Sequence, residues 1–410
     1  MSNTAKILST FFYFWLICVN ISCSHAGKSV EDFSDRVKSD RIVVAAERIN
    51  EYVPLLRNKT IAIVANQTSQ LGQKHLVDSL ISLGSKIKCV FAPEHGFRGE
   101  AGAGDKIPDG IDRKTGLPII SLYGKHLKPT REDLRNVDIV LFDIQDVGAR
   151  FYTYISTLQY VMESCAENNV EMIVLDRPNP NGYYVDGPVL EDNFKSFVGM
   201  CNIPVVHGMT IGEYAKMLKG EKWFMQSDSL KLKVVLIENY THDSLYKLPI
   251  RPSPNLPNME SVYLYPSLCF FEGTSISLGR GTPFPFQCIG FPGLKNGTIS
   301  FTPVNIKGVV SNPPYRDTLC QGLDLRSSVF NEGKLDGKIQ IHLLLDMYDS
   351  FPAKHKFFNS FFEKLAGTGK LREQIINRTS EADIRKSWEP ELSAFKKIRK
   401  KYLLYPDFTE

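Results

Sequence analysis

Four short apolar segments of this chain each end in a run of acidic, basic or amide side chains. These runs are Asn66-Gln67-Thr68, Glu94-His95-Gly96-Phe97-Arg98, Asp143-Ile144-Gln145-Asp146 and Asp176-Arg177-Pro178-Asn179. In an open α/β sheet the carboxyl ends of parallel strands meet at one edge, and ligands bind there. Any one run could be a solvated loop, but four together predict a single polar site.

Carboxylic acids in such a site could hydrolyse a glycosidic bond, which needs a protonated acid and usually a second carboxylate. Glu94 is the candidate acid because it follows Phe91-Ala92-Pro93, an apolar approach that would favour its protonated form. The alternative is that Glu94 forms a structural ion pair with His95 or Arg98.

The second carboxylate has three candidates. Asp143 and Asp146 stand three residues apart after a predicted strand, and one of them could instead cap the following helix. Glu272 lies in a later stretch, Glu272-Gly273-Thr274, with Arg280 eight residues on; these two could close the site or form a surface ion pair. No metal is predicted, because no helical H-E-x-x-H or comparable ligand spacing is present.

Aromatic side chains accompany these polar runs. Phe97, Tyr123, Tyr152 and Tyr154 are predicted beside the same edge, where they could stack on a sugar ring, although Tyr154 could equally belong to the core. Glycines at 99, 102, 104 and 110 predict a mobile lid. A dinucleotide fingerprint would have to open a helix directly after the first strand, so no nucleotide cofactor is predicted.

The elements that position these residues follow from hydrophobic periodicity. Six short strands are predicted at residues 60–65, 87–92, 119–122, 139–142, 172–175 and 232–237. Helical patterns lie between several of them, which predicts a doubly wound, mainly parallel α/β sheet. Thr210 with Glu213 forms a capping box, Thr130 with Asp133 resembles another, and residues 149–164 carry an apolar stripe.

Four prolines between residues 248 and 258 exclude regular structure and mark a domain boundary. We therefore expect a catalytic domain over residues 42–250 and a smaller α+β domain over residues 251–410, with the cleft between them. Helical patterns are predicted in the second domain at 343–366 and 391–403.

The N-terminus is typical of a secretory signal peptide over residues 1–25. Lys6 is the only charged residue before Lys28, and residues 11–19 form an apolar run too short to span a membrane. The chain is therefore expected to be exported. Cys23 could be acylated as in a bacterial lipoprotein, or cleavage could occur near Ala26 without a lipid.

The overall charge argues against nucleic acid as a partner. The chain carries a net charge of +4 with acidic and basic residues interspersed, so no basic stripe is formed. A membrane is expected only through the lipid that Cys23 would carry.

Longer motifs built on these residues resemble one known family. They are Pro93-Glu94-His95-Gly96-Phe97-Arg98-Gly99, Ser121-Leu122-Tyr123-Gly124, Asp143 to Tyr154, Asp176-Arg177-Pro178-Asn179-Pro180, His207-Gly208-Met209-Thr210, Pro252-Ser253-Pro254-Asn255 and Glu272-Gly273-Thr274. Together they are similar to the YbbC/NamZ-type exo-β-N-acetylmuramidases of glycoside hydrolase family 171. The resemblance covers roughly residues 45 to 405.

This resemblance implies a Rossmann-like domain of altered topology packed on a smaller C-terminal domain. It implies release of terminal β-linked N-acetylmuramic acid from the non-reducing end of peptidoglycan fragments in the periplasm or at the cell surface. The family's glutamate falls on Glu94. A non-catalytic glycan-binding protein of the same shape is the alternative.

The substrate's lactyl carboxylate calls for a fixed cationic group. Its candidates are Arg98, Arg150, Arg177 and Arg280. Asn66, His207 and Asn255 are candidates for binding hydroxyl groups, and His95 and Asp176 complete the expected binding site.

Overall fold

The structure is a computed structural model that describes residues 41–99, 102, 109–331, 334–335 and 337–409. Residues 42–410 form one compact unit. The predicted signal peptide with Cys23 and most of the predicted lid at 99–110 lie outside the described residues. None of the helices in the described part of the chain is long and apolar enough to cross a membrane.

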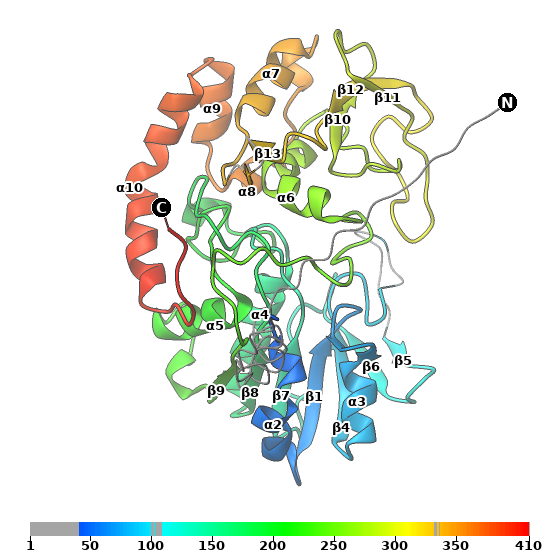
Figure 1. Ribbon diagram of the computed structural model, residues 1–410, viewed down its shortest axis with the longest axis vertical. Coiled ribbons are helices and arrows are strands. Elements are labelled where there is room, and N and C mark those ends of the chain that lie inside the picture. Colours follow the sequence, from blue (N-terminus) through cyan, green and yellow to red (C-terminus); the bar gives the residue numbers. More distant parts are fainter. Residues whose placement is uncertain (1–40, 100–101, 103–108, 332–333, 336, 410) are drawn as a thin grey trace, which may run out of the picture. The chain divides into compact units, whose positions relative to one another are not determined.

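A seven-stranded sheet forms the first half of this unit (Figure 1). Its strands, in spatial order, are β5 (Gly110–Ile111), β6 (Pro118–Ser121), β4 (Lys86–Ala92), β1 (Thr60–Ala65), β7 (Ile139–Asp143), β8 (Glu171–Leu175) and β9 (Leu232–Val235). All neighbours pair in parallel except β5 with β6. The doubly wound sheet is confirmed, but the altered topology that the family resemblance implied is wrong, because the six parallel strands follow the ordinary Rossmann order 3-2-1-4-5-6.

Alternating side chains of the strands enter two separate hydrophobic cores. On β1, Ile61 and Ile63 face one core, whereas Ala62 and Val64 face the other. Side chains of a strand point alternately to the two faces of a sheet, so a strand covered on both sides is apolar throughout. This explains why the six predicted strands appear in the structure with shifts of at most two residues at their ends.

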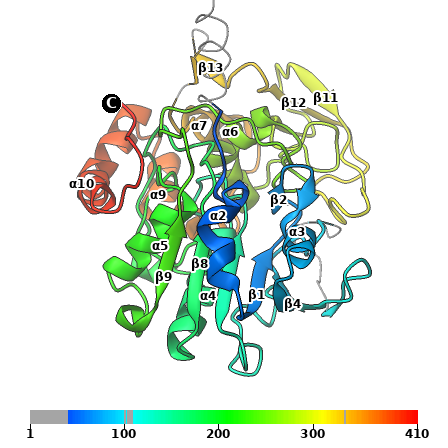
Figure 2. The same cartoon turned by 60° about the horizontal axis from the view of Figure 1, so that its bottom comes forward.

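Helices cover both faces of the sheet (Figure 2). The regular ones are α2 (Ile49–Tyr52), α3 (Leu76–Ser82), α4 (Tyr154–Glu167) and α5 (Ile211–Gly220). The short elements are η1 (Ala45–Glu47), η2 (Val53–Leu56), η3 (Asp192–Phe194), η4 (Ser227–Ser229) and the hairpin of β2 (Gln70–Leu71) and β3 (Lys74–His75). The capping box of Thr210 and Glu213 is confirmed at the start of α5.

Two helix predictions in this half need correction. The helix predicted from residue 149 begins at Tyr154, because residues 149–153 form an irregular segment ahead of it. Thr130 and Asp133 do exchange their capping hydrogen bonds, but residues 131–136 form turns and no α-helix. A capped first turn does not propagate here because Asn136 already has a φ of +58°.

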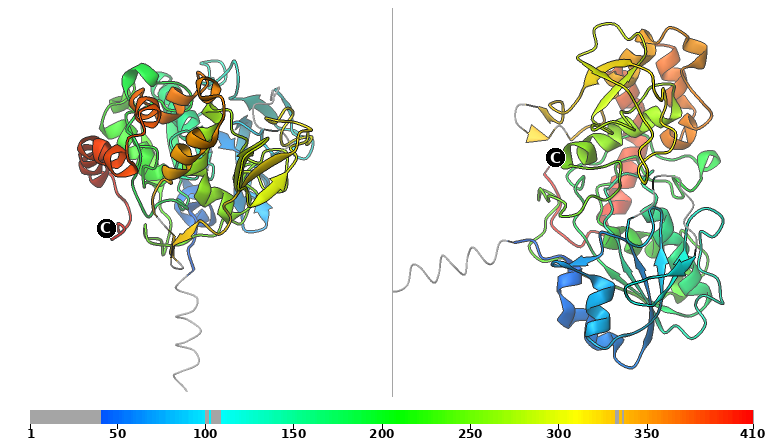
Figure 3. Two further views of the ribbon diagram at one scale, coloured as in Figure 1. Left: turned by 90° about the horizontal axis from the view of Figure 1, so that it is seen from above. Right: turned by 90° about the vertical axis from the view of Figure 1, so that its right-hand side faces the viewer.

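The second half lies beyond the carboxyl ends of the parallel strands (Figure 3). Its helices are α6 (Met259–Leu268), η5 (Cys269–Gly273), α7 (His342–Ser350), η6 (Lys354–Lys356), α8 (Phe362–Ala366), α9 (Lys370–Ile376) and α10 (Glu381–Lys400). Its strands are β10 (Cys288–Phe291), β11 (Ile299–Phe301), β12 (Cys320–Asp324), β13 (Phe330–Asn331) and β14 (Lys334–Leu335). β10, β12 and β11 form an antiparallel sheet, so the expected α+β character is confirmed.

The continuous helical pattern predicted for 343–366 is divided into α7 and α8 in the structure. Pro352 disfavours the helical conformation of the residue before it, and Phe351 is extended, with φ −73° and ψ 126°. The last helix, predicted for 391–403, begins ten residues earlier at Glu381 and contains Pro390.

The C-terminal segment packs back onto the first half. Tyr405 donates a hydrogen bond of 2.6 Å to Asp176, and the Arg399 guanidinium donates to the carbonyl oxygen of Gly208 at 2.7 Å. One hydrophobic core also extends from α4 and α5 to α7 and α8. The two halves therefore hold each other in place around the site between them.

Candidate active site

Glu94 follows β4 after one intervening residue and lines a cavity of about 380 Å³. The hydroxyl group of Thr153 donates a hydrogen bond of 2.9 Å to Oε2 of Glu94. The hydroxyl group of Tyr154 lies 3.4 Å from the backbone carbonyl oxygen of Glu94. Both donors stand at the beginning of α4, so this helix holds the carboxyl group in place at the edge of the sheet.

The backbone turns sharply after Glu94. His95 and Gly96 have φ values of +71° and +78°, and the Gly96 N–H donates to the carbonyl oxygen of Pro93 at 3.0 Å. Residues other than glycine seldom adopt such a conformation, and those that do are often found at functional sites. His95 is buried and also lines the cavity.

Glu272 and Arg280 reach the same cavity from the second half. Arg280 donates to Oε1 of Glu272 through Nε at 3.1 Å and also through Nη2. The guanidinium lies over the ring of Phe286, 4.9 Å from its centroid. Within the described residues no hydrogen bond engages Nη1 of Arg280 or Oε2 of Glu272, so both atoms are available to a ligand.

The charge of Arg280 is secured by its partner. Burial alone would lower the pKa of Arg280, but the nearby carboxylate of Glu272 outweighs this effect and raises the pKa above its ordinary value. The guanidinium therefore stays protonated while its side chain is only 19% exposed. A partly desolvated arginine of this kind is suited to binding a carboxylate.

Aromatic rings form much of the cavity wall. They are Tyr123, Phe151, Tyr152, Tyr265, Phe286, Phe197 and Phe361. Phe151, Tyr152 and Phe286 each contact Tyr265, with ring centroids 5.1 to 5.6 Å apart. Carboxylates surrounded by aromatic faces are typical of a site that binds a sugar ring.

Two further predicted residues complete the wall. Asn255 is buried and donates through Nδ2 to the carbonyl oxygen of Val309 at 3.0 Å, while its Oδ1 has no partner among the described residues. Tyr152 donates to the carbonyl oxygen of Pro252 at 2.8 Å. Because burial raises the pKa of Tyr152 well above its usual range, its hydroxyl stays protonated.

The other three candidate arginines are not among the residues that line this cavity. Arg98 is paired with Asp112 at 2.7 Å and Asp78 at 3.2 Å. Arg150 is fully buried and donates to four carbonyl oxygens, those of Pro188, Ile203, Leu365 and Ala366. Burial lowers its pKa to about 9. The guanidinium groups of Arg98 and Arg150 therefore bind other groups of the protein. Arg150 also connects the two halves, because it donates hydrogen bonds to both.

Arg177, the third of these arginines, forms a buried ion pair with Asp143, with contacts of 2.6 and 2.9 Å. Asp143 is completely buried and is not part of the cavity lining. Asp176 is buried as well, and it accepts hydrogen bonds from the Thr210 hydroxyl at 2.7 Å and from Tyr405. Burial raises the pKa of Asp176 to about 7. Asp143 at the end of β7 and Asp176 and Arg177 after β8 therefore bind other groups of the protein and do not face the cavity.

Asp146 and His207 are buried and are not among the residues that line the cavity. Asp146 accepts a hydrogen bond of 2.6 Å from the Gly148 N–H, and burial raises its pKa to about 7. His207 Nε2 is 4.0 Å from Asp146 Oδ2, and burial lowers the pKa of His207 to about 3. The imidazole is therefore neutral at neutral pH, so this is no ion pair.

Asn66, Phe97 and Tyr154 are the remaining predicted residues, and all three are buried outside the lining. Asn66 accepts two hydrogen bonds from Thr68 and so shapes the turn after β1. Tyr154 supports the backbone of Glu94. Among the described residues, no group of three or more His, Cys, Asp or Glu side chains is arranged to hold a metal ion.

Several lining residues were not predicted from the sequence. Thr153 lies within the motif from Asp143 to Tyr154. Its position between Tyr152 and Tyr154, both predicted site residues, was the sequence feature that could have identified it. Ser253 lies in the proline-rich motif at the domain boundary. Phe197, Phe286 and Phe361 come from separate distant segments with no motif of their own, so only the folded chain brings them together.

Comparisons with known proteins show the family to which the chain belongs. A family model described as the N-terminal part of exo-β-N-acetylmuramidase NamZ matches residues 61–260, and the corresponding C-terminal model matches residues 263–405. The curated peptidoglycan β-N-acetylmuramidase NamZ of Bacillus subtilis strain 168 is 42% identical over 374 residues, which cover 87% of this chain and 89% of that protein.

Two crystal structures of DUF1343 family proteins from Bacteroides fragilis NCTC 9343 are similar to this chain. The first has a TM-score of 0.83 at 45% identity and covers 90% of this chain and 99% of its own. The second has a TM-score of 0.76 at 29% identity and covers 89% and 99%.

Proposed function

The chain belongs to the NamZ family of exo-β-N-acetylmuramidases, and from this membership we propose that it releases terminal β-1,4-linked N-acetylmuramic acid from the non-reducing end of peptidoglycan fragments. It is a glycoside hydrolase. The curated relative is named for this activity, which argues against the alternative of a non-catalytic glycan-binding protein.

One observation supports the assignment of the site more than any other. Glu94 and Glu272 line a single cavity from the two halves of the chain, and aromatic rings line the same cavity. Two carboxyl groups beside a sugar-sized, aromatic space are what glycoside hydrolysis requires. Asp143 and Asp146 are less suited to the second role, because Asp143 is buried against Arg177 and Asp146 is buried outside the cavity lining.

Glu94 is proposed to act first, as the proton donor. Its acidic proton passes to the glycosidic oxygen while the bond between that oxygen and the anomeric carbon breaks. The Thr153 hydroxyl donates to Oε2, so the proton of the neutral acid belongs on Oε1. Glu94 would then act as the base and take a proton from the incoming water.

Glu272 is proposed to stabilise the reaction centre. The 2-acetamido oxygen of the sugar can form a bond to the anomeric carbon as the leaving group departs, which places positive charge on the acetamido group. A carboxylate beside that group stabilises this charge and can accept its N–H. Oε2 of Glu272 is suited to this task because Oε1 already accepts both hydrogen bonds from Arg280.

Arg280 is proposed to recognise the lactyl group, which distinguishes N-acetylmuramic acid from N-acetylglucosamine. Of the four arginines considered from the sequence, it is the one that lines the cavity. Its Nη1 donors could bind the lactyl carboxylate while Nε and Nη2 remain on Glu272.

We also propose that the chain is exported to the periplasm, where peptidoglycan fragments occur. The N-terminal apolar run supports export, and Cys23 raises the alternative of a lipid anchor. Mass spectrometry of the mature N-terminus decides between the two. A chain beginning near Ala26 without a lipid supports simple secretion, whereas an acylated Cys23 supports the anchor, and an intact Met1 contradicts export.

Product analysis tests the proposed reaction. Purified enzyme is incubated with a disaccharide of N-acetylmuramic acid β-1,4-linked to N-acetylglucosamine, and with the disaccharide of reversed order. Free N-acetylmuramic acid from the first substrate alone is the expected result. Hydrolysis of both substrates, or of neither, contradicts the proposed specificity or the proposed reaction respectively.

A further inference from the structure

The cavity between the two halves has a buried part and an aromatic rim. Tyr152, Tyr265 and Phe286 belong to the buried part, since each is no more than 8% exposed. Tyr123 and Phe197 form the aromatic rim: they line the same cavity but are only half-buried, so they lie where it meets the solvent.

Tyr123 stands beside the proposed proton donor. β4 and β6 are parallel neighbours, and their last residues, Ala92 and Ser121, pair with each other. The Leu122 N–H continues this pairing by donating to the carbonyl oxygen of Ala92 at 2.8 Å. Glu94 and Tyr123 each follow their strand end by two residues, and neighbouring strands lie about 5 Å apart. The strand pairing therefore brings Tyr123 next to Glu94.

Phe197 is attached to the same region by α4. Its carbonyl oxygen accepts a hydrogen bond of 2.7 Å from the hydroxyl group of Ser156, in the first turn of that helix. Thr153, directly before α4, donates to Glu94. The beginning of one helix thus fixes both the proposed proton donor and Phe197.

The rings of the aromatic rim also contact each other. The centroids of Tyr123 and Phe197 are 6.3 Å apart, with the ring planes tilted by 56°. Tyr160 of α4 stacks almost parallel to Phe197, at 6.3 Å and 15°. Tyr160 supports Phe197 and is not itself among the lining residues.

The position of Glu94 determines which part of the substrate meets the aromatic rim. The acid must lie beside the glycosidic oxygen, because its proton passes to that atom. The leaving sugar is attached to this oxygen, so it lies on the side of Glu94, whereas N-acetylmuramic acid extends towards Glu272 and Arg280 of the second half. Aromatic rings bind the apolar face of a sugar well.

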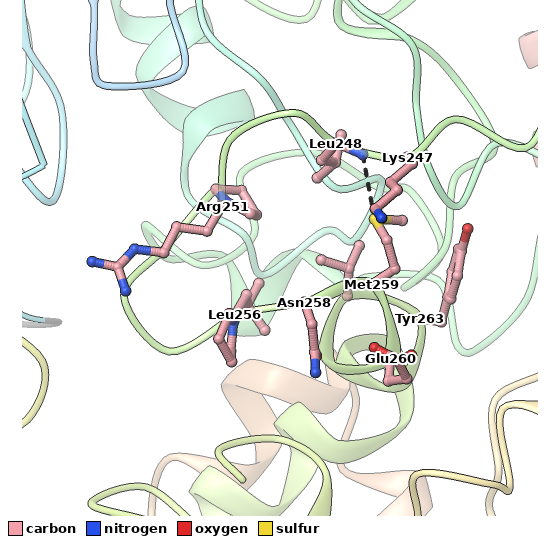
Figure 4. A pocket seen from close by; sticks show the side chains of 11 residues that line it. Lys247, Leu248, Arg251, Leu256, Asn258, Met259, Glu260 and Tyr263 are labelled. Atoms are coloured by element: carbon pink, nitrogen blue, oxygen red, sulfur yellow. Dashed lines mark hydrogen bonds between the residues drawn. The ribbon is translucent and has the colours of Figure 1, made fainter. Parts of the chain in front are cut away.

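A second cavity, of about 470 Å³, is the alternative place for the leaving sugar; its lining includes Lys247 and Tyr263 (Figure 4). It adjoins the first cavity, since Leu256 lines both. The segment between them is held in place, because the carbonyl oxygen of Pro252 accepts a hydrogen bond of 2.8 Å from Tyr152. A leaving sugar would have to cross this segment, whereas the aromatic rim is part of the first cavity itself.

We propose that Tyr123 and Phe197 form the subsite for the N-acetylglucosamine that leaves. This inference rests on the proposed function and assigns the residues that bind the sugar on the other side of the cleaved bond. The two rings bind the apolar face of that sugar while Glu94 protonates its oxygen. The efficiency of the enzyme therefore depends on whether the leaving group is a sugar.

Two substrates test this proposal: the disaccharide with N-acetylglucosamine, and the methyl β-glycoside of N-acetylmuramic acid, whose leaving group is too small to reach the rings. Phe197→Leu keeps an apolar side chain against Tyr160 but removes the ring. It should lower kcat/KM about tenfold on the disaccharide, mainly by raising KM, and should change it less than about twofold on the methyl glycoside. Phe197→Tyr retains a ring and should recover most of the loss.

Tyr263→Leu is the matched control, because Tyr263 is also half-buried but lines the second cavity. It should leave kcat/KM on both substrates within about twofold of wild type. A loss on the disaccharide in Tyr263→Leu and not in Phe197→Leu would place the leaving sugar in the second cavity. Equal losses of Phe197→Leu on both substrates would show that the ring only supports the cavity, and either result overturns the proposal.

Calorimetry separates this inference from the proposed function. Glu94→Gln is titrated with the disaccharide and with the methyl glycoside, which measures affinity without turnover. Tighter binding of the disaccharide that Phe197→Leu abolishes supports the subsite, even for an enzyme that fails the product analysis. Equal affinity for the two ligands, or an advantage of the disaccharide that survives Phe197→Leu, overturns it.

Discussion

The Thr153 hydroxyl donates a 2.9 Å hydrogen bond to the carboxyl group of Glu94. Thr153 directly precedes α4, and its side chain does not cap that helix. The hydroxyl group therefore binds Glu94 and does not stabilise the beginning of the helix. This contact links a residue after β7 to a residue after β4, which are separated in the sheet by β1.

Removing this hydrogen bond should slow catalysis without weakening binding. Thr153→Val keeps the shape of the side chain but leaves Glu94 Oε2 without this donor, so the carboxyl group is oriented less well. We expect kcat to fall about tenfold with KM within about twofold, because one hydrogen bond contributes about 1 to 1.5 kcal/mol. Steady-state kinetics measure both values.

Thr153→Ser is the control for that variant, because it retains the hydroxyl group. It should recover most of the wild-type kcat. If kcat is equally low in Thr153→Ser and Thr153→Val, the methyl group of Thr153 is needed for catalysis and the hydrogen bond to Glu94 is not.

Two of the three candidates for the second carboxylate, Glu272 and Asp143, should respond differently to amide substitution. Glu272→Gln should lower kcat about a hundredfold with little change in the melting temperature, because Glu272 faces the cavity. Asp143→Asn should destabilise the fold by about 3 kcal/mol, since the buried Arg177 loses its partner. Kinetics and denaturant unfolding of both variants check this. A folded Asp143→Asn enzyme that is as slow as Glu272→Gln would contradict the assignment.

Arg280 should determine the preference for N-acetylmuramic acid. Arg280→Lys loses the planar donor geometry, so kcat/KM on the muramic substrate should fall about thirtyfold, or about 2 kcal/mol, with a smaller effect on the matching N-acetylglucosamine substrate. Chromogenic substrates of the two sugars measure the ratio.

Arg326→Lys is a matched control for Arg280→Lys. Arg326 also pairs with a carboxylate, Asp324, and lies over a phenylalanine ring, that of Phe284, but it is not part of the cavity lining. Its substitution should leave the ratio unchanged. A loss of discrimination in both variants would indicate a general effect of lysine, against direct recognition by Arg280.

Asp146 should make the fold less stable as the pH rises. Burial raises its pKa to about 7 from an ordinary value of 3.8, so the folded protein keeps a proton that the unfolded chain has released. Its contribution to the free energy of unfolding therefore falls from about pH 4 to about pH 7 and is constant above that. His207, with a pKa lowered to about 3, contributes in the opposite direction below about pH 6.5.

Asp146→Asn removes the Asp146 contribution and leaves that of His207. The variant should therefore be less destabilised, relative to wild type, at about pH 7.5 than at about pH 4.5, by about 3 kcal/mol. Denaturant unfolding at the two pH values measures the difference. The same destabilisation at both values would show that Asp146 is ionised in the folded protein throughout this range.

The sequence was sufficient to predict the sheet and the edge at which the site lies. Strands buried on both faces are continuously apolar, so β1, β4, β7 and β8 could be located together with the polar residues that follow them. Glu94 follows directly from this pattern. Its position in the cavity depends on the turn at His95, which the sequence alone did not predict.

The direction in which a side chain points was less predictable from the sequence than the place of its residue in the fold. Asp143 and Arg177 follow neighbouring strands, as expected, but they face each other and not the cavity. A strand end places a residue at an edge, whereas the direction of its side chain depends on which partner is within reach. Arg150 shows the same effect, because its guanidinium binds the carbonyl oxygens of segments up to 216 residues away.

Comparison of Glu94→Gln with wild type on a chromogenic β-N-acetylmuramic acid substrate tests the central claim most directly. Glutamine keeps the size of the side chain but cannot supply the proton, so kcat should fall by at least about a hundredfold while the fold is retained. Thr210→Ser, which keeps the hydroxyl group that caps α5 away from the cavity, serves as the control and should remain active. Full activity of Glu94→Gln would contradict the account.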